Sequence, residues 1–140
     1  MERVTNGESS VLEINVYILK KRKNTAIRLI ASIVSQQLST TVAAIIFKRF
    51  LDIYKGKEPS LKAIIDTPFD TLRGIGLSNS KVNYVQNVAQ FFLSQKITDK
   101  QLYAMEPEDV ITLLTQIKGV GRWTVEMLLM FSLSWLLLPA

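Results

Sequence analysis

The stretch LTQIKGVGRWT, residues 114–124, decides the fold of this chain. It leads from one apolar segment to the next through a Gly-Val-Gly turn at residues 119–121. Two glycines around one β-branched residue let the backbone take positive φ, so we expect a hairpin followed by a helix whose first amides are unpaired. Those amides, at the positive end of the helix dipole, suit a phosphate. With Lys118 and Arg122 beside them, the hairpin is predicted to bind a nucleic-acid backbone without reading its sequence. An ordinary turn between two helices is the alternative.

Helical spacing dominates the rest of the chain. Apolar side chains recur every three or four residues through residues 27–38 and 42–53, as on the buried face of a helix. Helix starts are predicted by a capping serine or by proline at the first helical position, at Ser60, Pro68, Ser78 and Pro107. We therefore expect about seven or eight short helices in an all-α, compact bundle that contains a helix-hairpin-helix motif.

The first 24 residues do not follow this spacing. Leu12, Ile14, Val16 and Ile18 alternate with polar or amphipathic residues, which is typical of a strand. A lone strand has no partner in an all-helical domain, so the segment could equally be a helix, a tail or sequence foreign to the domain. Residues 1–24 stay unplaced, and residues 25–140 are predicted to form the helical domain.

Composition narrows the classes of function. With 140 residues, 48% of them apolar, the chain can bury one core. Its net charge of +5 and pI near 9.6 favour a polyanionic partner. Because the sequence lacks histidine and cysteine, it has no zinc-finger ligands, thiolate nucleophile or cysteine-ligated cluster, and no cofactor is expected.

Neither apolar stretch of the sequence fits a membrane or secretion signal. The apolar run at 127–138 is too short to span a bilayer, and the basic residues at 20–23 follow an apolar run where a signal peptide needs them before it. We expect a cytoplasmic or nucleoid/nuclear protein that is not secreted, with no membrane and no protein partner.

Three separated blocks carry a family resemblance: ASIVSQQLS at 31–39, LRGIGLSNSKVNY at 72–84 and IKGVGRWTVE at 117–126. In order and spacing they resemble the helix-hairpin-helix DNA glycosylases, and within them the 3-methyladenine (alkylpurine) branch. The resemblance implies an N-glycosylase of base excision repair that acts on double-stranded DNA containing alkylated bases. Such an enzyme kinks the duplex, flips the damaged nucleotide into a pocket and hydrolyses the bond between base and deoxyribose.

The resemblance also assigns the base pocket. Trp123 occupies the position where bifunctional relatives carry a Schiff-base lysine, so this chain is expected to be monofunctional. Its indole suits a cationic alkylated purine, although a core anchor is the alternative. Gln36 and Gln37 are expected to face the pocket or the DNA gap, or else to bond neighbouring backbone.

The remaining implied contacts are with the DNA backbone and stack. Asn79 resembles the wedge that fills the vacated base stack, with Leu77 as its rival and a plain turn residue as the alternative. The residues expected to touch DNA are Leu77, Asn79, Lys81, Lys118, Gly119, Val120, Gly121, Arg122 and Thr124. In the family the hairpin carbonyls also bind a structural monovalent cation, which carries over to Thr115, Ile117 and Val120.

The chain departs from the family in its carboxylates. Relatives carry an aspartate about twenty positions beyond the second hairpin glycine, which stabilises the oxocarbenium-like sugar. Here no aspartate follows Asp109, so the expected aspartate would lie beyond Ala140, the last residue of the sequence. Glu126 is the only carboxylate after the hairpin and a weak substitute.

A domain incomplete at its C-terminal end is therefore expected. In the family, the helices beyond that aspartate pack against the N-terminal ones, and without them we expect the apolar faces of 27–38 and 127–138 to be partly exposed. A non-catalytic DNA-binding module or inactive truncated fragment is the alternative.

Overall fold

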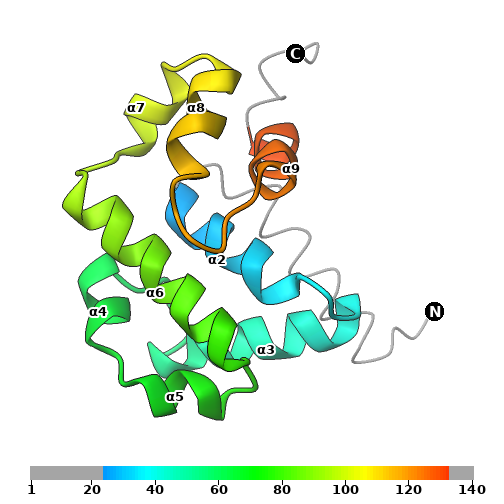
Figure 1. The fold of residues 1–140 in the computed structure, drawn as a ribbon. Helices are drawn as coiled ribbons and strands as arrows, with labels where there is room; N and C mark the ends of the chain where they lie inside the picture. Colours follow the sequence, from blue (N-terminus) through cyan, green and yellow to red (C-terminus); the bar gives the residue numbers. More distant parts are fainter. Residues whose placement is uncertain (1–23, 133–140) are drawn as a thin grey trace, which may run out of the picture.

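The computed structural model describes residues 24–132, and within that range it is helical and contains no strand (Figure 1). The helices of this range are α2 (Thr25–Ser35), α3 (Thr40–Ile53), α4 (Leu61–Asp66), α5 (Phe69–Gly74), α6 (Asn79–Ser94), α7 (Asp99–Tyr103), α8 (Pro107–Leu114) and α9 (Arg122–Ser132). The predicted all-α bundle of short helices is confirmed. The alternating segment at 12–18 lies outside the described residues. No helix between residues 24 and 132 has the length and apolar character needed to cross a membrane.

Most helix starts follow the local signals in the sequence. The hydroxyl groups of Ser60 and Ser78 accept hydrogen bonds from amides three residues ahead, at 3.1 and 3.2 Å, and so cap α4 and α6. Pro107 is the first residue of α8, where its missing N–H costs nothing. Pro68 stands one residue earlier than expected, as the N-cap of α5. Side-chain caps and proline therefore set the helix boundaries that the sequence predicted.

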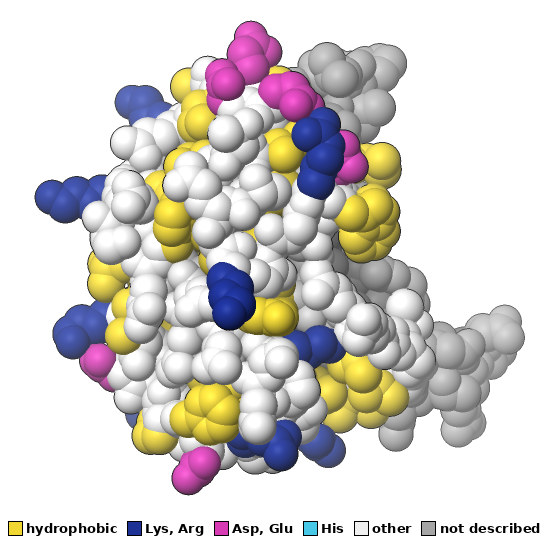
Figure 2. Space-filling model, in the orientation of Figure 1, with side chains coloured by type: hydrophobic (Ala, Val, Ile, Leu, Met, Phe, Trp, Pro, Cys, Tyr) yellow, Lys and Arg dark blue, Asp and Glu magenta, His cyan; other side chains and the backbone are white. Residues whose placement is uncertain are grey.

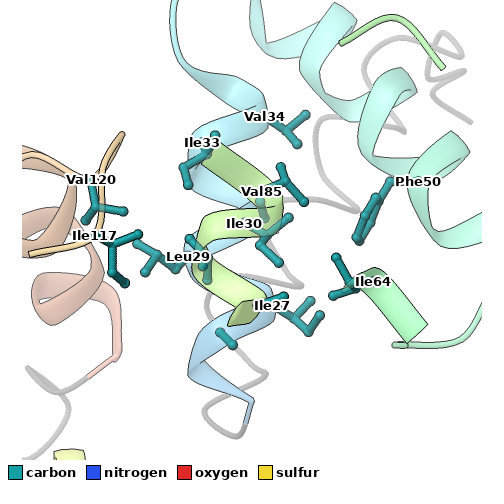
Figure 3. Packing of buried hydrophobic residues seen from close by; sticks show 14 of the residues in the cluster. Ile27, Leu29, Ile30, Ile33, Val34, Phe50, Ile64, Val85, Ile117 and Val120 are labelled. Atoms are coloured by element: carbon teal, nitrogen blue, oxygen red, sulfur yellow. The ribbon is translucent and has the colours of Figure 1, made fainter. Parts of the chain in front are cut away.

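Helix α2 is the centre of the core. Its apolar residues point to two sides in Figure 3, where Ile27 and Ile30 lie toward Phe50 of α3 and Ile64 of α4, and Leu29 lies toward Ile117 of the hairpin. Helices α3, α6 and α9 all pack directly on α2. Burial on every side explains why this helix is apolar almost all round.

The apolar face of α2 is covered, contrary to expectation. Ile27, Ile30 and Ile33 are completely buried, so the predicted exposure of this face is wrong for α2. Exposed apolar side chains occur instead after α2 and on the outer turns of other helices, at Leu38, Val42, Ile45 and Met130.

Two expectations about the C-terminal end fall on residues that the structure does not describe. The gap expected beside 127–138 lies largely outside the described residues. Ala140, beyond which the catalytic aspartate was expected, also lies outside the described residues. Both therefore stay predictions from the sequence.

Candidate nucleic-acid interface and base pocket

The hairpin between α8 and α9 packs on the core with one side and exposes the other side to solvent. Ile117 and Val120 are buried against the core (Figure 3), whereas Lys118 between them is exposed. The amide of Val120 donates to the carbonyl of Ile117 at 3.0 Å, and Gly119 takes φ +103° at the third position of this turn, as in type II turns. The apolar pair thus holds a tight turn whose tip faces solvent.

Only the first glycine of the hairpin needs to be glycine for backbone reasons. Gly119 has positive φ, and a Cβ there would lie 2.2 Å from the Tyr84 ring. Gly121 has no positive φ, and a Cβ there would meet nothing within 4 Å. The expectation of positive φ at both glycines is therefore wrong for Gly121.

Helix α9 begins with uncovered amides. Its first backbone bond runs from the amide of Val125 to the carbonyl of Gly121, at 3.2 Å. The amides of residues 122–124 precede that bond, and glycine at the cap position has no side chain to cover them. Together with the exposed Lys118, these donors form the predicted phosphate-binding end of α9.

Arg122 is not the free cation that the sequence suggested. Its guanidinium binds the carboxylates of Glu108, at 2.7 Å, and Glu126, at 3.0 Å. The hydrogen bonds that Arg122 donates to Glu108 and Glu126 raise the pKa of Arg122 further above its usual value. Since two carboxylates already neutralise it, Lys118 is the principal positive side chain of the hairpin, and Arg122 is corrected to an ion-pair residue on the surface.

A cavity of about 470 Å³ opens beside the hairpin, between the end of α2 and the first turns of α9. Its lining includes all three residues predicted for the base pocket, Gln36, Gln37 and Trp123, with Arg28, Ser32, Ser35, Met127 and Leu128. Trp123 is 65% exposed, so its indole is not a core anchor. The cavity thus has an aromatic wall and polar rim on two different helices.

The two glutamine side chains of the cavity differ in hydrogen bonding and in exposure to solvent. The Gln36 side chain donates from Nε2 to the hydroxyl of Thr124 at 2.8 Å, which joins the end of α2 to α9. Gln37 is exposed and adopts the left-handed conformation, with φ 62°. Thr124 is buried and its hydroxyl holds the Gln36 side chain, while the expectation that Thr124 touches DNA stays a prediction.

Lys81 also has a structural partner. Its ammonium donates to the carbonyls of Val34, at 2.9 Å, and Gln36, at 2.5 Å, and so closes the C-terminal end of α2. Desolvation by burial lowers the pKa of Lys81 below its usual range. We therefore correct its expected phosphate contact to a helix cap that shapes the pocket rim.

The loop before α6 separates the two candidate wedge residues. Leu77 is 1% exposed and belongs to the core, so it cannot enter a base stack without unpacking. Asn79 is exposed as the first residue of α6. Arg49 and Arg73 donate to the carbonyls of the preceding loop, at Ile75 (3.3 Å) and Leu77 (2.6 Å). Asn79 thus remains as the wedge candidate, on a loop held by two arginines that sequence reasoning missed.

Charge is unevenly distributed over the face that carries the hairpin (Figure 2). Acidic side chains gather mainly at its upper edge, where α7 and α8 lie in Figure 1, and several basic ones gather near its lower edge. Glu126 binds Arg122 and does not line the cavity. The weak proposal of Glu126 as a catalytic carboxylate is thus not supported by its position. No carboxylate occurs among the described residues that line the cavity.

Arg28 is the pocket residue that sequence reasoning missed. Its side chain is 1% exposed, lines the cavity and donates to the Tyr103 hydroxyl at 3.1 Å and the Thr25 hydroxyl at 3.4 Å. The available signal was an arginine inside the apolar run at 25–34, because a charged residue is almost never fully buried unless paired.

Comparison with known proteins agrees with this geometry. Residues 30–129 match the HhH-GPD superfamily of base excision DNA repair proteins. The chain is 42% identical over 108 residues to DNA-3-methyladenine glycosylase 1 of Schizosaccharomyces pombe, which covers 76% of this chain and 47% of that protein. It is 34% identical over 116 residues to the alkylbase DNA glycosidase-like protein mag2 of the same yeast, covering 80% and 54%. The chain thus spans about half the length of these curated relatives.

Solved structures show the same fold. The S. pombe 3-methyladenine DNA glycosylase in complex with abasic DNA superposes with a TM-score of 0.76 at 34% identity, covering 93% of this chain and 66% of that one. A DNA-3-methyladenine glycosidase from Bacillus halodurans gives 0.74 at 28% identity, covering 93% and 65%. The chain therefore belongs to the HhH-GPD superfamily of base excision DNA repair proteins.

Proposed function

We propose that this chain recognises alkylated purines in double-stranded DNA, as the base-binding part of a monofunctional 3-methyladenine DNA glycosylase. The observation that carries the proposal is the position of Trp123. Its exposed indole lines a cavity that Gln36 and Gln37 also line, just after the hairpin proposed to bind phosphate. The relatives named as 3-methyladenine glycosylases support the choice of base.

The pocket residues have distinct roles in this proposal. The face of Trp123 stacks on the flipped purine and, through the ring quadrupole, favours a positively charged one by about 0.5–2 kcal/mol. Gln37 offers an exposed amide to the base edge or the gap in the duplex. Gln36, held by Thr124, and Lys81, held by α2, keep the rim in place. Asn79 enters the vacated stack.

Hydrolysis requires a group that the described lining of the cavity does not supply. Charge develops on the sugar as the glycosidic bond breaks, and a carboxylate nearby commonly stabilises it by several kcal/mol. Glu126 is engaged by Arg122 outside the cavity. We therefore propose binding and base flipping by the chain of 140 residues, with base release near background. The non-catalytic DNA-binding module is the second candidate, favoured by the same lack of a carboxylate among the described lining residues.

The hairpin carbonyls of Thr115, Ile117 and Val120 are the proposed ligands of a monovalent cation. Each carbonyl oxygen has two lone pairs, and that of Ile117 uses one on the amide of Val120, which leaves the other for an ion. Carbonyl oxygens are suitable ligands for hard cations, and a bound ion would add positive charge beside the DNA phosphate. Replacing potassium and sodium by tetramethylammonium at constant ionic strength should then weaken DNA binding.

The function is tested by matched hairpin variants. Wild type, Gly119→Ala and Gly121→Ala are compared by fluorescence anisotropy with a duplex that carries a central abasic analogue. Gly119→Ala should weaken binding about tenfold or more, because the new Cβ meets the Tyr84 ring and displaces the amides, whereas Gly121→Ala should bind like wild type. Equal binding by a folded Gly119→Ala protein would overturn the hairpin assignment.

A second assay tests whether the chain of 140 residues is catalytic. The chain is incubated with methylated duplex DNA and released bases are quantified, with Glu126→Gln measured in parallel. We expect base release near background from both proteins. We also propose that the protein acts in a compartment that contains DNA, either the cytoplasm or the nucleus. Strong release by wild type that Glu126→Gln abolishes would show that Glu126 is catalytic after all.

A further inference from the structure

A second groove, of about 320 Å³, lies between α6 and the hairpin and shares no lining residue with the base pocket. It is lined by Ser80, Asn83, Tyr84 and Asn87 of α6 and by Lys118 of the hairpin. None of these residues was assigned to this groove by the sequence, and only Lys118 was expected to touch DNA. The proposal below rests on the proposed function, because it extends the same DNA-binding face.

The groove is built from one face of α6. Ser80, Asn83 and Asn87 are spaced by three and four residues, so their side chains project from the same side of the helix. Asn87 donates from Nδ2 to the carbonyl of Lys118 at 3.2 Å and thereby holds the hairpin against α6. The ring of Tyr84 lies directly under Gly119 and forms the floor. Packing thus fixes the groove before any ligand arrives.

Its chemistry fits the backbone of a nucleic acid. The lining carries one positive charge, on Lys118, and otherwise neutral hydroxyl, amide and phenol groups, with no carboxylate among the described residues. Lysine, serine, asparagine and tyrosine side chains supply many of the contacts that proteins make to phosphate and sugar. A cationic or strongly apolar ligand would find no matching partner there.

The position of the groove indicates the direction of the strand. It lies between the hairpin, where Lys118 is exposed, and Asn79 at the start of α6. The helical rise from Asn79 to Asn87 is about 12 Å, which corresponds to roughly three to four base-pair steps measured along the axis of a duplex. We infer that one DNA strand runs from the hairpin along Ser80 and Asn83 to Asn79, and that its phosphates and sugars occupy this groove.

A pair of charge variants tests the path. Asn83→Glu and Gln90→Glu each place one carboxylate on an exposed position of α6, inside and outside the groove respectively. Binding of the full chain to the abasic duplex is measured by anisotropy. Because a carboxylate inside the groove repels phosphate, Asn83→Glu should weaken binding at least tenfold, while Gln90→Glu should change it less than about threefold. Equal effects of the two variants would overturn the inference.

The salt dependence provides a second measurement. The double variant Ser80→Ala, Asn83→Ala removes two neutral contacts and should weaken binding about tenfold without changing the slope of log K against log salt, because neutral groups release no counterions. Lys118→Ala should lower that slope by about 0.9. If the double variant binds DNA as tightly as wild type and Lys118→Ala binds more weakly, the strand does not follow this groove. The proposed function would still stand in that case. No binding by wild type would instead refute the proposed function.

Discussion

Trp123 shows how one exposed side chain can define a site. A tryptophan that is 65% exposed contributes little to packing, yet this one forms the wall of a cavity with Gln36 and Gln37. Exposing so large an apolar surface to water is unfavourable, and a planar ligand stacked on the indole would bury it.

Replacing Trp123 should therefore affect ligand selectivity more than stability. We expect wild type to bind 7-methylguanosine, a cationic alkylated purine, about 2- to 30-fold more tightly than guanosine, and Trp123→Ala to lose that preference. Competition for the abasic duplex measures both nucleosides. Met130→Ala, at an exposed position of α9 outside the cavity, is the control. An unchanged preference in Trp123→Ala would exclude stacking on the indole.

The end of α2 is an element held by residues distant in sequence. Lys81 supplies donors to two of the carbonyls at this end, which water or a capping residue would otherwise satisfy. Lys81→Met should lower the free energy of unfolding by about 1–3 kcal/mol, since hydrogen bonds from a charged donor are lost. Lys62→Met, which removes only an exposed ion pair with Asp66, should cost less than about 0.5 kcal/mol. Urea denaturation compares the two, and equal costs would mean that Lys81 does not act as a cap.

A hydrogen bond between the Tyr54 phenol and the Thr67 hydroxyl joins the end of α3 to the end of α4. The Thr67 hydroxyl donates to the carbonyl of Ala63 at 2.7 Å, so Tyr54 must be the donor in its 2.8 Å bond with Thr67. Burial raises the pKa of Tyr54 above its ordinary value.

This raised pKa gives a pH dependence with a definite sign. Above about pH 10 the unfolded chain loses the Tyr54 proton before the folded one, so the unfolded state binds fewer protons and stability falls as pH rises. Tyr54→Phe should show a smaller loss of stability between about pH 9.5 and 11, measured by urea unfolding at each pH. Identical alkaline profiles for the two proteins would contradict this assignment.

Local signals in the sequence predicted the elements but not the connections between them. Apolar spacing and caps such as Ser60 depend on neighbours a few residues away, and these predictions were confirmed. The positive φ of Gly119 was also foreseen. The ion pair of Arg122 with Glu108 and the bond of Gln36 to Thr124 join residues 14 and 88 positions apart, and no local pattern encodes them. That is why the sequence did not show that Arg122 is ion-paired, that Thr124 holds Gln36 or that Lys81 caps α2.

At the scale of the whole molecule, the core is one continuous cluster that reaches from α2 to the hairpin and to α4. Ile30→Ala should therefore destabilise every helix together, by about 2–5 kcal/mol, out of the 5–15 kcal/mol typical of a domain. Helical circular dichroism and hydrogen exchange at the hairpin should report the same transition. Ile45→Ala, at an exposed position on α3, should cost less than about 1 kcal/mol. Separate transitions for the hairpin and α3 would contradict a single cooperative unit.

The bond between Gln36 and Thr124 has a consequence for the time at which the pocket forms. It closes a loop of 88 residues, so Gln36 leaves the ribosome well before Thr124. Closing so long a loop has a substantial entropic cost that only the packing of α9 on α2 can offset. A nascent or C-terminally cleaved chain should therefore form α3 to α6 without a site for a base. The pocket becomes available only when α9 has joined the fold, so a nascent chain whose α9 is still inside the ribosome has no site for a base.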